Sequence, residues 1–585
     1  MIPRTPPLST VLSLLALLCA IYLALAPTRV NSRCRNRPGD PGWPSLSAWS
    51  HLNASLNFNL VDLRPIASVC HEPISDQPAC NIVQRMSSSG RWRTGQPGAL
   101  INTFWESGFG SNETCSLSDW PESCHQGRIP LYAALVESPQ EVQTAVNFAR
   151  QHNLRLVVRN TGHDGAGSSS GPDTFQIFTG RLDSIQYHPA GSNRSVGAPA
   201  VSVGAGVLIG DLYAHGRQNG FIVTGGDSAT VGAAGGFIQG GGVPGFLGYT
   251  WGLAVDNVVE FEVVTAAGDL ITANANQHAD LFWALRGGGG GTFGVVVRVT
   301  MLAYPDHRAV KSTISVSGDG QSPSFWSQDI AALLGVIQAL NRQGTAGVFR
   351  LWQTPAGQLA ASTEMYFLNQ TDEKGVSNAN RVVTALLGGT TASERYAIST
   401  TLLDSLSSDV AADVPTITEL FGSTLISNTL FHSEDGPRLL AERMSQIGLR
   451  DGEWLLTSNL GGRVNDPRPR GETPLHPAWG SSAQLVSLVV NVDSTEGGAV
   501  RDRAMQRLTH ELMPKMYALD PGAQRVSYRN MGDPNEPGFQ DVYWGAANYE
   551  RLDRIKRDWD PRDLFISRVG VGSERWDFEG VCRSG

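Results

Sequence analysis

The sequence predicts an α+β protein with two main domains, at about residues 126–305 and 306–520. Its 585 residues are more than one hydrophobic core usually serves. Strand-like and helix-like segments alternate around glycine-rich loops in the first region, which predicts a mixed α/β unit. In the second region helices alternate with isolated strands without such loops, which predicts an α+β unit. The chain carries 41% hydrophobic and 17% charged residues, as globular proteins do, and a net charge of −9 without a basic cluster argues against a nucleic-acid partner.

Residues 1–32 resemble a secretory signal peptide. Arg4 precedes the nearly apolar run from Leu8 to Ala26, and Val30 and Ser32 fit the small-residue pattern before a cleavage site. The apolar run is also close to the length of a spanning helix, so an uncleaved signal anchor is the alternative. Either way the body enters the secretory pathway, and we expect a secreted protein, with a form anchored facing the lumen or exterior as the second possibility.

Residues 33–125 are rich in Pro, Ser, Asn and Cys and show little periodicity, so we expect a loop-rich, Cys-rich extension. Without Cys19 an even number of cysteines remains, and none forms a C-x-x-C pair, which favours disulfides over a metal site. We therefore expect no metal, while the connectivity is not determined. The six cysteines are Cys34, Cys70, Cys80, Cys115, Cys124 and Cys582. Four sequons predict N-glycans, at Asn53, Asn112, Asn193 and Asn369.

The region 126–305 begins with a helix in which Ser138 is the N-cap, Pro139 the first helical residue and Glu141 the end of a capping box. Its apolar stripe is Val142, Ala145, Val146 and Ala149. Further elements follow in order: the strands 154–158 and 201–207, a helix ended by Gly220, two strands within 257–274, and a helix, a five-glycine loop and a strand within 278–302.

The region 306–520 predicts a helix at 329–343 and strands at 348–354, 362–369 and 483–492. A final segment, 521–585, contains a predicted helix at 549–558 with Leu552 and Ile555 facing inward.

Two glycine-rich loops are the candidates for chemistry. The first, "RNTGHDGAG" (159–167), follows a strand, and in the second 10 of the 24 residues of 225–248 are Gly. Backbone N–H groups in such loops form concavities for phosphate oxygens. One nucleotide needs only one such loop, so two loops favour a long anionic cofactor. His163 in the first loop is a candidate functional residue, although a loop histidine satisfied by backbone groups is the plain alternative.

Other sites with known signatures fit less well. The G-x-G-x-x-G at 240–245 lacks a leading strand, and Pro244 stands where a helix would begin, so a Rossmann site is disfavoured. No G-x-S-x-G pentapeptide indicates a serine hydrolase. His163 has no companion ligand within a helical turn, so zinc is disfavoured.

The motifs in their order resemble the FAD-linked oxidases of the vanillyl-alcohol oxidase and berberine-bridge-enzyme type. The segments are "VRNTGHDGAG", "VSVGAGV", "TGGDSATVGAAGGFIQGGG", "LAVDNVVEFEVVTAAGDL", "DLFWALRGGGGGTFGVV" and "YWGAANYERLDRIKRDWDPRDLF". Fungal secreted or biosynthetic members, such as isoamyl alcohol oxidase-like proteins, look most similar. The resemblance implies a PCMH-type FAD-binding domain of two mixed α/β subdomains at 126–305, an α+β substrate domain with an antiparallel sheet at 306–520, and a segment 521–585 that returns to the FAD domain.

The resemblance also implies roles for individual residues. In this family the histidine of R-x-x-G-H, here Arg159, Gly162 and His163, is linked to the flavin 8α carbon. Some members add a second link through a cysteine, but Ser228 stands at that position, so we expect one link only. Tyr528 in a Y-x-N segment is the expected catalytic base, against the alternative of a packed tyrosine. The remaining residues expected around the FAD are Asn160, Thr161, Asp164, Gly226, Gly232, Gly235, Gly241, Gly242, Asp256, Val258, Asn530 and Asn548.

The expected activity is hydride transfer from a small alcohol or a secondary metabolite to FAD, with O2 as acceptor and H2O2 as product. A carbohydrate oxidase or an oxidative cyclase is the alternative within the family, and a secreted binding protein without redox activity is the alternative outside it. The expected partners are the small substrate and O2, and no feature indicates an obligate protein partner.

Overall fold

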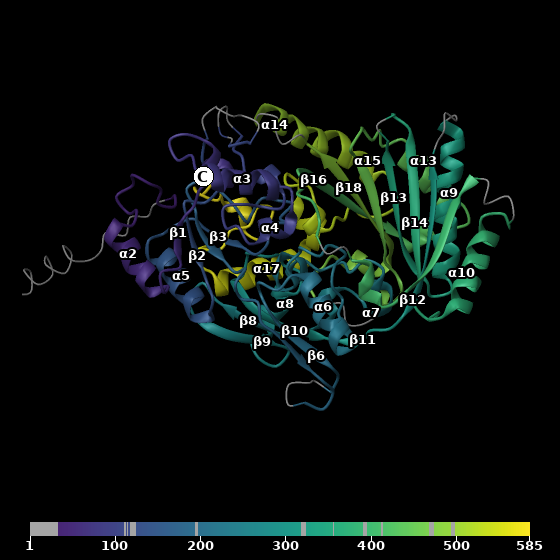
Figure 1. The fold of residues 1–585 in the computed structure, drawn as a ribbon, viewed down its shortest axis with the longest axis horizontal. Coiled ribbons are helices and arrows are strands. Elements are labelled where there is room, and N and C mark those ends of the chain that lie inside the picture. Colours follow the sequence, from purple (N-terminus) through teal and green to yellow (C-terminus); the bar gives the residue numbers. More distant parts are fainter. Residues whose placement is uncertain are drawn as a thin grey trace, which may run out of the picture.

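The computed structural model places a seven-stranded sheet from the second half of the chain beside an α/β part built from the first half and from the carboxyl-terminal segment (Figure 1). The structure describes residues 33–584 except 110–112, 114, 118–123, 193–196, 318–322, 355, 390–394, 411–412, 467–472 and 493–497. The predicted signal segment 1–32 and the sequons at Asn112 and Asn193 lie outside the described residues. No helix of the described part is long and apolar enough to cross a membrane.

The α/β part begins with a four-stranded sheet in which three strands are parallel. Its strand order is β1 (Leu60–Asp62), β2 (Tyr132–Leu135), β4 (Phe175–Phe178) and β3 (Leu156–Arg159), with β1 antiparallel at the edge. Helix α5 (Pro139–Gln151) buries its predicted apolar stripe completely. Ser138 caps it as predicted, but Glu141 accepts a hydrogen bond from the N–H of Glu137 rather than from that of Ser138. The capping box therefore closes one residue earlier than the pattern predicts.

A five-stranded antiparallel sheet packs beside the first. Its order is β5 (Ile185–His188), β6 (Ala200–Gly204), β10 (Val295–Leu302), β8 (Val258–Val264) and β9 (Leu270–Asn274). Helices α6 (Ile209–Asn219) and α8 (Ala279–Leu285) occur where the periodicity predicts helices. Gly220 ends α6 with φ +74°, a conformation that favours glycine. Val264, Val295 and Val297 join the core of the first sheet, so the two sheets form one unit.

The amino-terminal extension is more regular than its composition predicts. It contains helices α2 (Leu46–Ser55), α3 (Gln77–Met86) and α4 (Gly90–Thr94), together with strand β1. The sequence interpretation missed these helices, which are capped by Ser45, Asp76 and Ser89, although α3 is amphipathic and buries Cys80 and Val83. Trp49 and Leu52 of α2 are buried in the core of the first sheet.

The second half of the chain forms one antiparallel sheet. Its strand order is β15 (Ala397–Leu403), β12 (Ala309–Ser317), β14 (Leu359–Phe367), β13 (Ala346–Gln353), β17 (Trp454–Asn459), β18 (Ser482–Asn491) and β16 (Glu419–Ser427). Helices α9 (Pro323–Asn341), α10 (Glu373–Leu386) and α13 (Gly436–Ser445) cover one face (Figure 1). The other face is turned toward the α/β part. This arrangement confirms the predicted α+β class with an antiparallel sheet.

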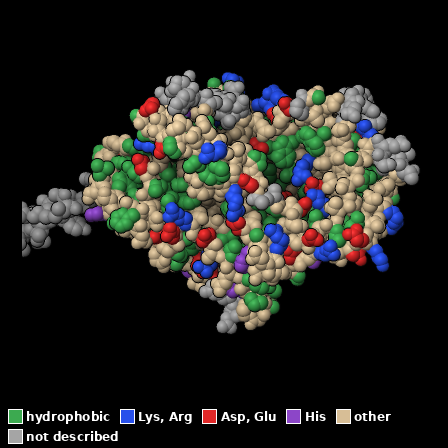
Figure 2. All heavy atoms as spheres, in the orientation of Figure 1, with side chains coloured by type: hydrophobic (Ala, Val, Ile, Leu, Met, Phe, Trp, Pro, Cys, Tyr) green, Lys and Arg blue, Asp and Glu red, His purple; other side chains and the backbone are tan. Residues whose placement is uncertain are grey.

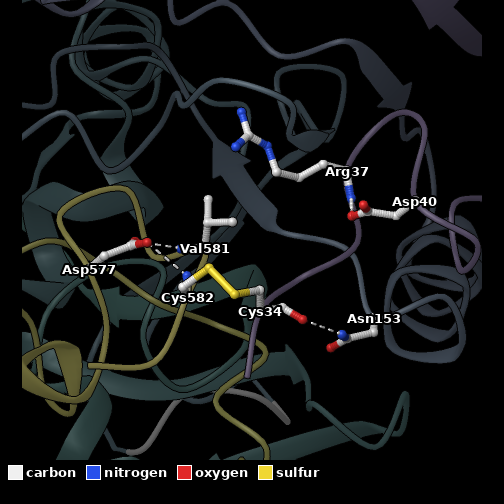
Figure 3. Close-up of a disulfide and its surroundings, with 7 residues drawn as sticks. All are labelled: Cys34, Arg37, Asp40, Asn153, Asp577, Val581 and Cys582. Atoms are coloured by element: carbon white, nitrogen blue, oxygen red, sulfur yellow. Dashed lines mark hydrogen bonds between the residues drawn. A yellow bond between two sulfur atoms is a disulfide. The ribbon is translucent and has the colours of Figure 1, made fainter. Parts of the chain in front are cut away.

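The carboxyl-terminal segment contacts the α/β part. This segment contains helices α16 (Phe539–Trp544) and α17 (Ala546–Trp559). In α17 the side chains of Leu552 and Ile555 are buried, as expected. A disulfide between Cys34 and Cys582 joins residues 548 positions apart, and Asn153 donates a hydrogen bond to the Cys34 carbonyl beside it (Figure 3). Two local disulfides, Cys70–Cys80 and Cys115–Cys124, complete the set.

Charge is distributed without a dominant sign. On the face shown in Figure 2, Lys and Arg side chains are interspersed with Asp and Glu. The predicted glycosylation positions in the described part differ in exposure. Asn369 is exposed, whereas Asn53 is half-buried in α2 and accepts a hydrogen bond from the Leu60 N–H.

Candidate cofactor site

A cavity of about 360 Å³ lies between the two glycine-rich loops and the open face of the seven-stranded sheet. Eleven of the predicted site residues line it, so residues far apart in the sequence meet here. They are Asn160, Thr161, Gly162, His163, Asp164, Gly226, Ser228, Gly232, Gly235, Tyr528 and Asn530. Residues from the five-glycine loop, Gly290 and Gly291, extend the wall.

The first loop is held in place by its own polar groups. Gly162 has φ +87°, and a Cβ there would lie 2.8 Å from the Cα of Leu100, so no other residue fits without strain. The Asp164 carboxylate accepts hydrogen bonds from the N–H groups of Ala166 and Ser169. Because Asp164 is used in this way, its role is to fix the turn that presents backbone groups to the cavity.

The two glycine-rich loops contact each other through Asn160. Its amide donates hydrogen bonds to the Ala205 carbonyl and, at 3.2 Å, to the Thr179 hydroxyl. A Cβ at Gly232 or Gly235 would overlap the Asn160 side-chain oxygen. Glycine is therefore required at positions 232 and 235 because the second loop approaches the first too closely for a Cβ.

His163 faces the cavity with a neutral ring. Its Nε2 lies 2.7 Å from the Thr230 hydroxyl of the second loop. Burial lowers the pKa of His163 to about 4, because the charged imidazolium loses its hydration there. A neutral imidazole has a nitrogen lone pair available, so His163 can act as a nucleophile at physiological pH.

Tyr528 and Asn530 close the cavity from the carboxyl-terminal segment. The Tyr528 hydroxyl accepts hydrogen bonds from the Asn530 amide at 2.8 Å and from the Val243 N–H at 3.4 Å. Both donors favour the phenolate, but burial outweighs them and raises the pKa of Tyr528 to about 12. The same Asn530 amide also donates to the carbonyls of Gly236 and Phe237, which ties this segment to the second loop.

Six predicted residues lie outside the cavity wall: Arg159, Gly241, Gly242, Asp256, Val258 and Asn548. Arg159 is buried beneath the first loop, where it donates to the Arg93 carbonyl and lies over the Phe178 ring. Asp256 accepts a hydrogen bond from the Leu253 N–H just before β8 begins at Val258. These residues support the loops from behind.

Asn548 lies in the first turn of α17 rather than at its start, because Gly545 is the N-cap. The Asn548 amide instead donates to the carbonyls of Pro474 and Leu475. It thus joins α17 to the segment that follows residue 472, and Leu475 in turn lies against Gly241.

The wall also includes residues that sequence reasoning missed. Arg529 and Gln239 line the cavity, and the Nε of Arg529 and the Oε1 of Gln239 are buried without a hydrogen-bond partner among the described residues. Buried polar atoms without partners are rare in folded proteins and are expected where a ligand supplies the partner. Arg529 could have been suspected from its place between Tyr528 and Asn530, whereas Gln239 gives no sequence signal.

The open face of the sheet supplies the remaining wall. Phe421, Leu456 and Leu485 of the strands β16, β17 and β18 face the cavity, with Ile417 just before β16. The wall is therefore backbone-rich and polar on the loop side and mainly apolar on the sheet side, where Ser458 supplies one hydroxyl. A long cofactor with phosphates and a flat ring fits this division, because loop N–H groups suit phosphates and apolar side chains suit a ring and its substrate.

Comparison with known proteins agrees with this geometry. Residues 130–274 match the family model described as FAD binding domain, and residues 527–572 match the one described as berberine and berberine like. The chain is 75% identical to FAD-linked oxidoreductase penH of Penicillium thymicola, over 100% of both chains. It is 56% identical to FAD-linked oxidoreductase asqF of Emericella nidulans, over 97% of this chain and 99% of that one.

Solved structures show the same fold. The VAO-type flavoprotein MtVAO615 of Myceliophthora thermophila C1 superimposes with a TM-score of 0.83 at 26% identity, covering 94% of this chain and 100% of that one. A variant of berberine bridge enzyme, solved in complex with (S)-reticuline, gives a TM-score of 0.66 at 18% identity over 90% and 99% of the two chains. The predicted family resemblance is thereby confirmed. The chain belongs to the FAD-linked oxidoreductases of the vanillyl-alcohol oxidase and berberine-bridge-enzyme type.

Proposed function

We propose that this oxidoreductase is an oxidase that takes hydride from a small alcohol or a secondary metabolite, with O2 as the final electron acceptor and H2O2 as product. The observation that carries the proposal is the cavity itself, in which His163 and the two glycine-rich loops face the apolar open face of the sheet. Bound FAD would supply the redox chemistry, accepting hydride from the donor and passing electrons to O2.

Within this proposal His163 is the single covalent tether of the flavin, through its 8α carbon. The neutral ring supports this role, and so does the contact of Nε2 with Thr230, which fixes the orientation of the imidazole. Ser228 lines the same cavity at the position where some relatives carry a second linking residue. A serine hydroxyl is a much weaker nucleophile than a thiolate, so no second link forms.

The loop groups hold the cofactor in the proposal. Backbone N–H groups of the first loop and of Gly225–Gly242 bind the pyrophosphate. The guanidinium of Arg529 donates to an acceptor of the cofactor through its Nε, which has no hydrogen-bond partner among the described residues. Asn530 keeps the second loop in place through its hydrogen bonds to Gly236 and Phe237.

An apolar donor fits the substrate side better than a sugar. Phe421, Leu456 and Leu485 offer no hydrogen bond to the many hydroxyls of a carbohydrate, and Ser458 adds only one hydroxyl to this wall, although one structural neighbour is a chitooligosaccharide oxidase. An oxidative cyclase acting on an apolar metabolite is compatible with the same wall and remains the second candidate.

Peroxide release tests the oxidase proposal. The purified protein is mixed with a panel of benzylic and allylic alcohols, N-methylated aromatic amines and oligosaccharides, and H2O2 is measured in air. The flavin spectrum is recorded with the same donors without oxygen. We expect bleaching of the flavin and peroxide release with an apolar donor. Bleaching without peroxide would show a dehydrogenase, and turnover of sugars alone would overturn the proposed donor class.

The proposed location is the secretory pathway. Three disulfides in the described part support an oxidising compartment. An N-glycan at the exposed Asn369 fits the structure, whereas one at Asn53 would break the hydrogen bond to Leu60. Glycosidase treatment of the protein from a fungal host, followed by mass spectrometry of peptides, tests both positions and the cleavage after residue 32.

A further inference from the structure

Asp227 is a carboxylate in the cofactor cavity that the reaction described above does not use. It follows Gly226 and precedes Ser228 in the second glycine-rich loop, and its side chain lines the cavity. The residue keeps more than a third of its surface accessible, while the protein groups around the cavity displace much of the water near its carboxylate. No hydrogen bond or ion pair to its oxygens is formed within the part of the chain that the structure describes.

Among the described residues, the charged groups that act on Asp227 are already paired with one another. Arg350 of β13 lies 3.1 Å from the Glu364 carboxylate of β14, and Lys311 of β12 lies 2.7 Å from Asp409. The cations therefore neutralise Glu364 and Asp409 rather than Asp227. From the other side the Tyr213 hydroxyl of α6 donates to the Gly226 carbonyl, not to the carboxylate.

The loop around Asp227 is shaped to leave room for the carboxylate. Gly245 has φ +51°, and a Cβ at this position would collide with the Asp227 carboxylate. Any residue with a side chain here would push the carboxylate away and would also be strained. Gly245 therefore lets the Asp227 carboxylate lie directly against the backbone of residue 245.

The protonation behaviour of Asp227 suits proton transfer. Burial is the main cause that raises the pKa of Asp227 to about 6, with Glu364 and Asp409 acting in the same direction and Arg350 against it. A carboxyl group with a pKa near 6 is ionised at neutral pH and still basic enough to accept a proton. Tyr528, with a pKa raised to about 12, is protonated at neutral pH and accepts a proton poorly.

We propose that Asp227 is the catalytic base of this enzyme, in place of the tyrosine that the sequence suggests. The assignment rests on the proposed oxidase function. An Asp227 oxygen takes the O–H or N–H proton of the donor while the neighbouring C–H bond breaks, and its hydrogen leaves with the electron pair to the bound FAD. The donor gains a C=O or C=N bond, and protonated Asp227 later releases its proton to water.

The proposal narrows the donor class. The donor must carry an ionisable O–H or N–H on the carbon that is oxidised, and an apolar body that fits Phe421, Leu456 and Leu485. Benzylic alcohols and secondary aromatic amines meet both conditions, whereas ethers and hydrocarbons without such a proton do not.

Asp227→Asn tests the assignment with Asp404→Asn as the matched control. Asp404 is a carboxylate with 92% of its side chain exposed, so its variant removes one charge outside the cavity. The limiting rate of flavin reduction is measured without oxygen, using the fastest donor of the alcohol and amine panel. We expect Asp227→Asn to keep its flavin and its donor affinity within about threefold, and to lose about 10²- to 10⁴-fold in limiting rate. Asp227→Glu should recover part of the rate.

The pH profile separates a base from a binding group. The wild-type limiting rate should rise with pH through about 6, because Asp227 must be ionised, and the Asp227→Asn rate should be flat there. A variant that loses donor affinity but keeps its limiting rate would show that Asp227 only binds a cationic donor, and this would overturn the assignment. So would a larger rate loss in Tyr528→Phe than in Asp227→Asn.

The titration of Asp227 can also be tested without a donor, by measuring the unfolding temperature as a function of pH. This measurement does not depend on the proposed oxidase function. An aspartate whose folded-state pKa lies above its unfolded value destabilises the fold progressively as pH rises from about 4 to above 6. The unfolding temperature of Asp227→Asn minus that of the wild type should therefore increase between pH 4.5 and pH 8. A constant difference would contradict a titrating Asp227. Flavin-free protein, or no donor in the panel, would instead count against the oxidase proposal.

Discussion

The two sides of the cavity wall are built from different parts of the chain and in different ways. The loop side uses backbone, with Gly162 and Gly232 allowing close approach and Asn160 joining the two loops. The sheet side uses side chains, such as Phe421 and Leu456, that project from regular strands. Binding of a ligand by backbone N–H groups requires glycine at particular positions, so the loop side is recognisable as a glycine pattern in the sequence. Binding by side chains depends only on which residues of a strand face the cavity, so substitutions on the sheet side can change the ligand without changing the fold.

Gly162→Ala is the strongest test of the claim that the loop side binds the cofactor through its backbone. The added Cβ would meet the Leu100 backbone at 2.8 Å in a conformation with φ +87°, and such strain costs about 1–3 kcal/mol. We expect the bound flavin to fall more than about tenfold per protein molecule. Gly220→Ala is the control, since it has a similar φ of +74° with no atom within 4 Å and lies outside the cavity. Equal flavin content in the two variants would contradict the contrast.

Substitution of one lysine on each side of the cavity wall compares how much buried charge contributes to the free energy of unfolding on the loop side and on the sheet side. Lys556 is fully buried, and its Nζ donates to the carbonyls of Thr292 and Phe565 and to Asp560, which anchors the five-glycine loop. Lys311 of the sheet is partly exposed beside Asp409. We expect Lys556→Met to lower the free energy of unfolding by about 3–5 kcal/mol, because it leaves Asp560 buried without its partner. Lys311→Met should lower it by about 1 kcal/mol.

Denaturant titrations of both lysine variants with intact flavin give these values. A larger loss for Lys311→Met would show that the sheet, rather than the loop side, depends on buried charge.

The disulfide between Cys34 and Cys582 joins the amino-terminal extension to the carboxyl-terminal segment on the loop side of the molecule. Replacing both cysteines with serine should lower the free energy of unfolding by about 2–4 kcal/mol, since the bond closes a loop of 548 residues. Flavin content should not change, because neither cysteine reaches the cavity. Thermal unfolding and flavin absorbance of the double variant check both expectations, and loss of flavin would show that the chain ends shape the cofactor site.

The smallest effect is expected on the sheet side. Leu456→Ala removes apolar surface from the substrate wall and should raise KM for the best apolar donor by about tenfold, which corresponds to about 1.4 kcal/mol. Flavin content should stay as in the wild type. Loss of flavin from this variant would show that the sheet also binds the cofactor, and it would contradict the assignment of cofactor binding to the loop side and substrate binding to the sheet side.

Sequence reasoning succeeded where local chemistry determines structure. The capped helix at Ser138 and the helix end at Gly220 are set by neighbouring residues, and both were predicted. In residues 33–125 helix α2 was missed because it is weakly periodic and α4 because it is short, whereas the amphipathic pattern of α3 could have been predicted. Asp227 was also missed as a base, since its significance depends on charges brought near by β13 and β14 and on the position of Gly245.

The tether at His163 is tested most directly by denaturing the purified protein in acid and measuring flavin absorbance in the washed precipitate. We predict a yellow precipitate from the wild type, and a colourless one from His163→Ala even when that variant binds some FAD before denaturation. A colourless wild-type precipitate, or a yellow one from His163→Ala, would contradict the assignment of His163 as the single tether.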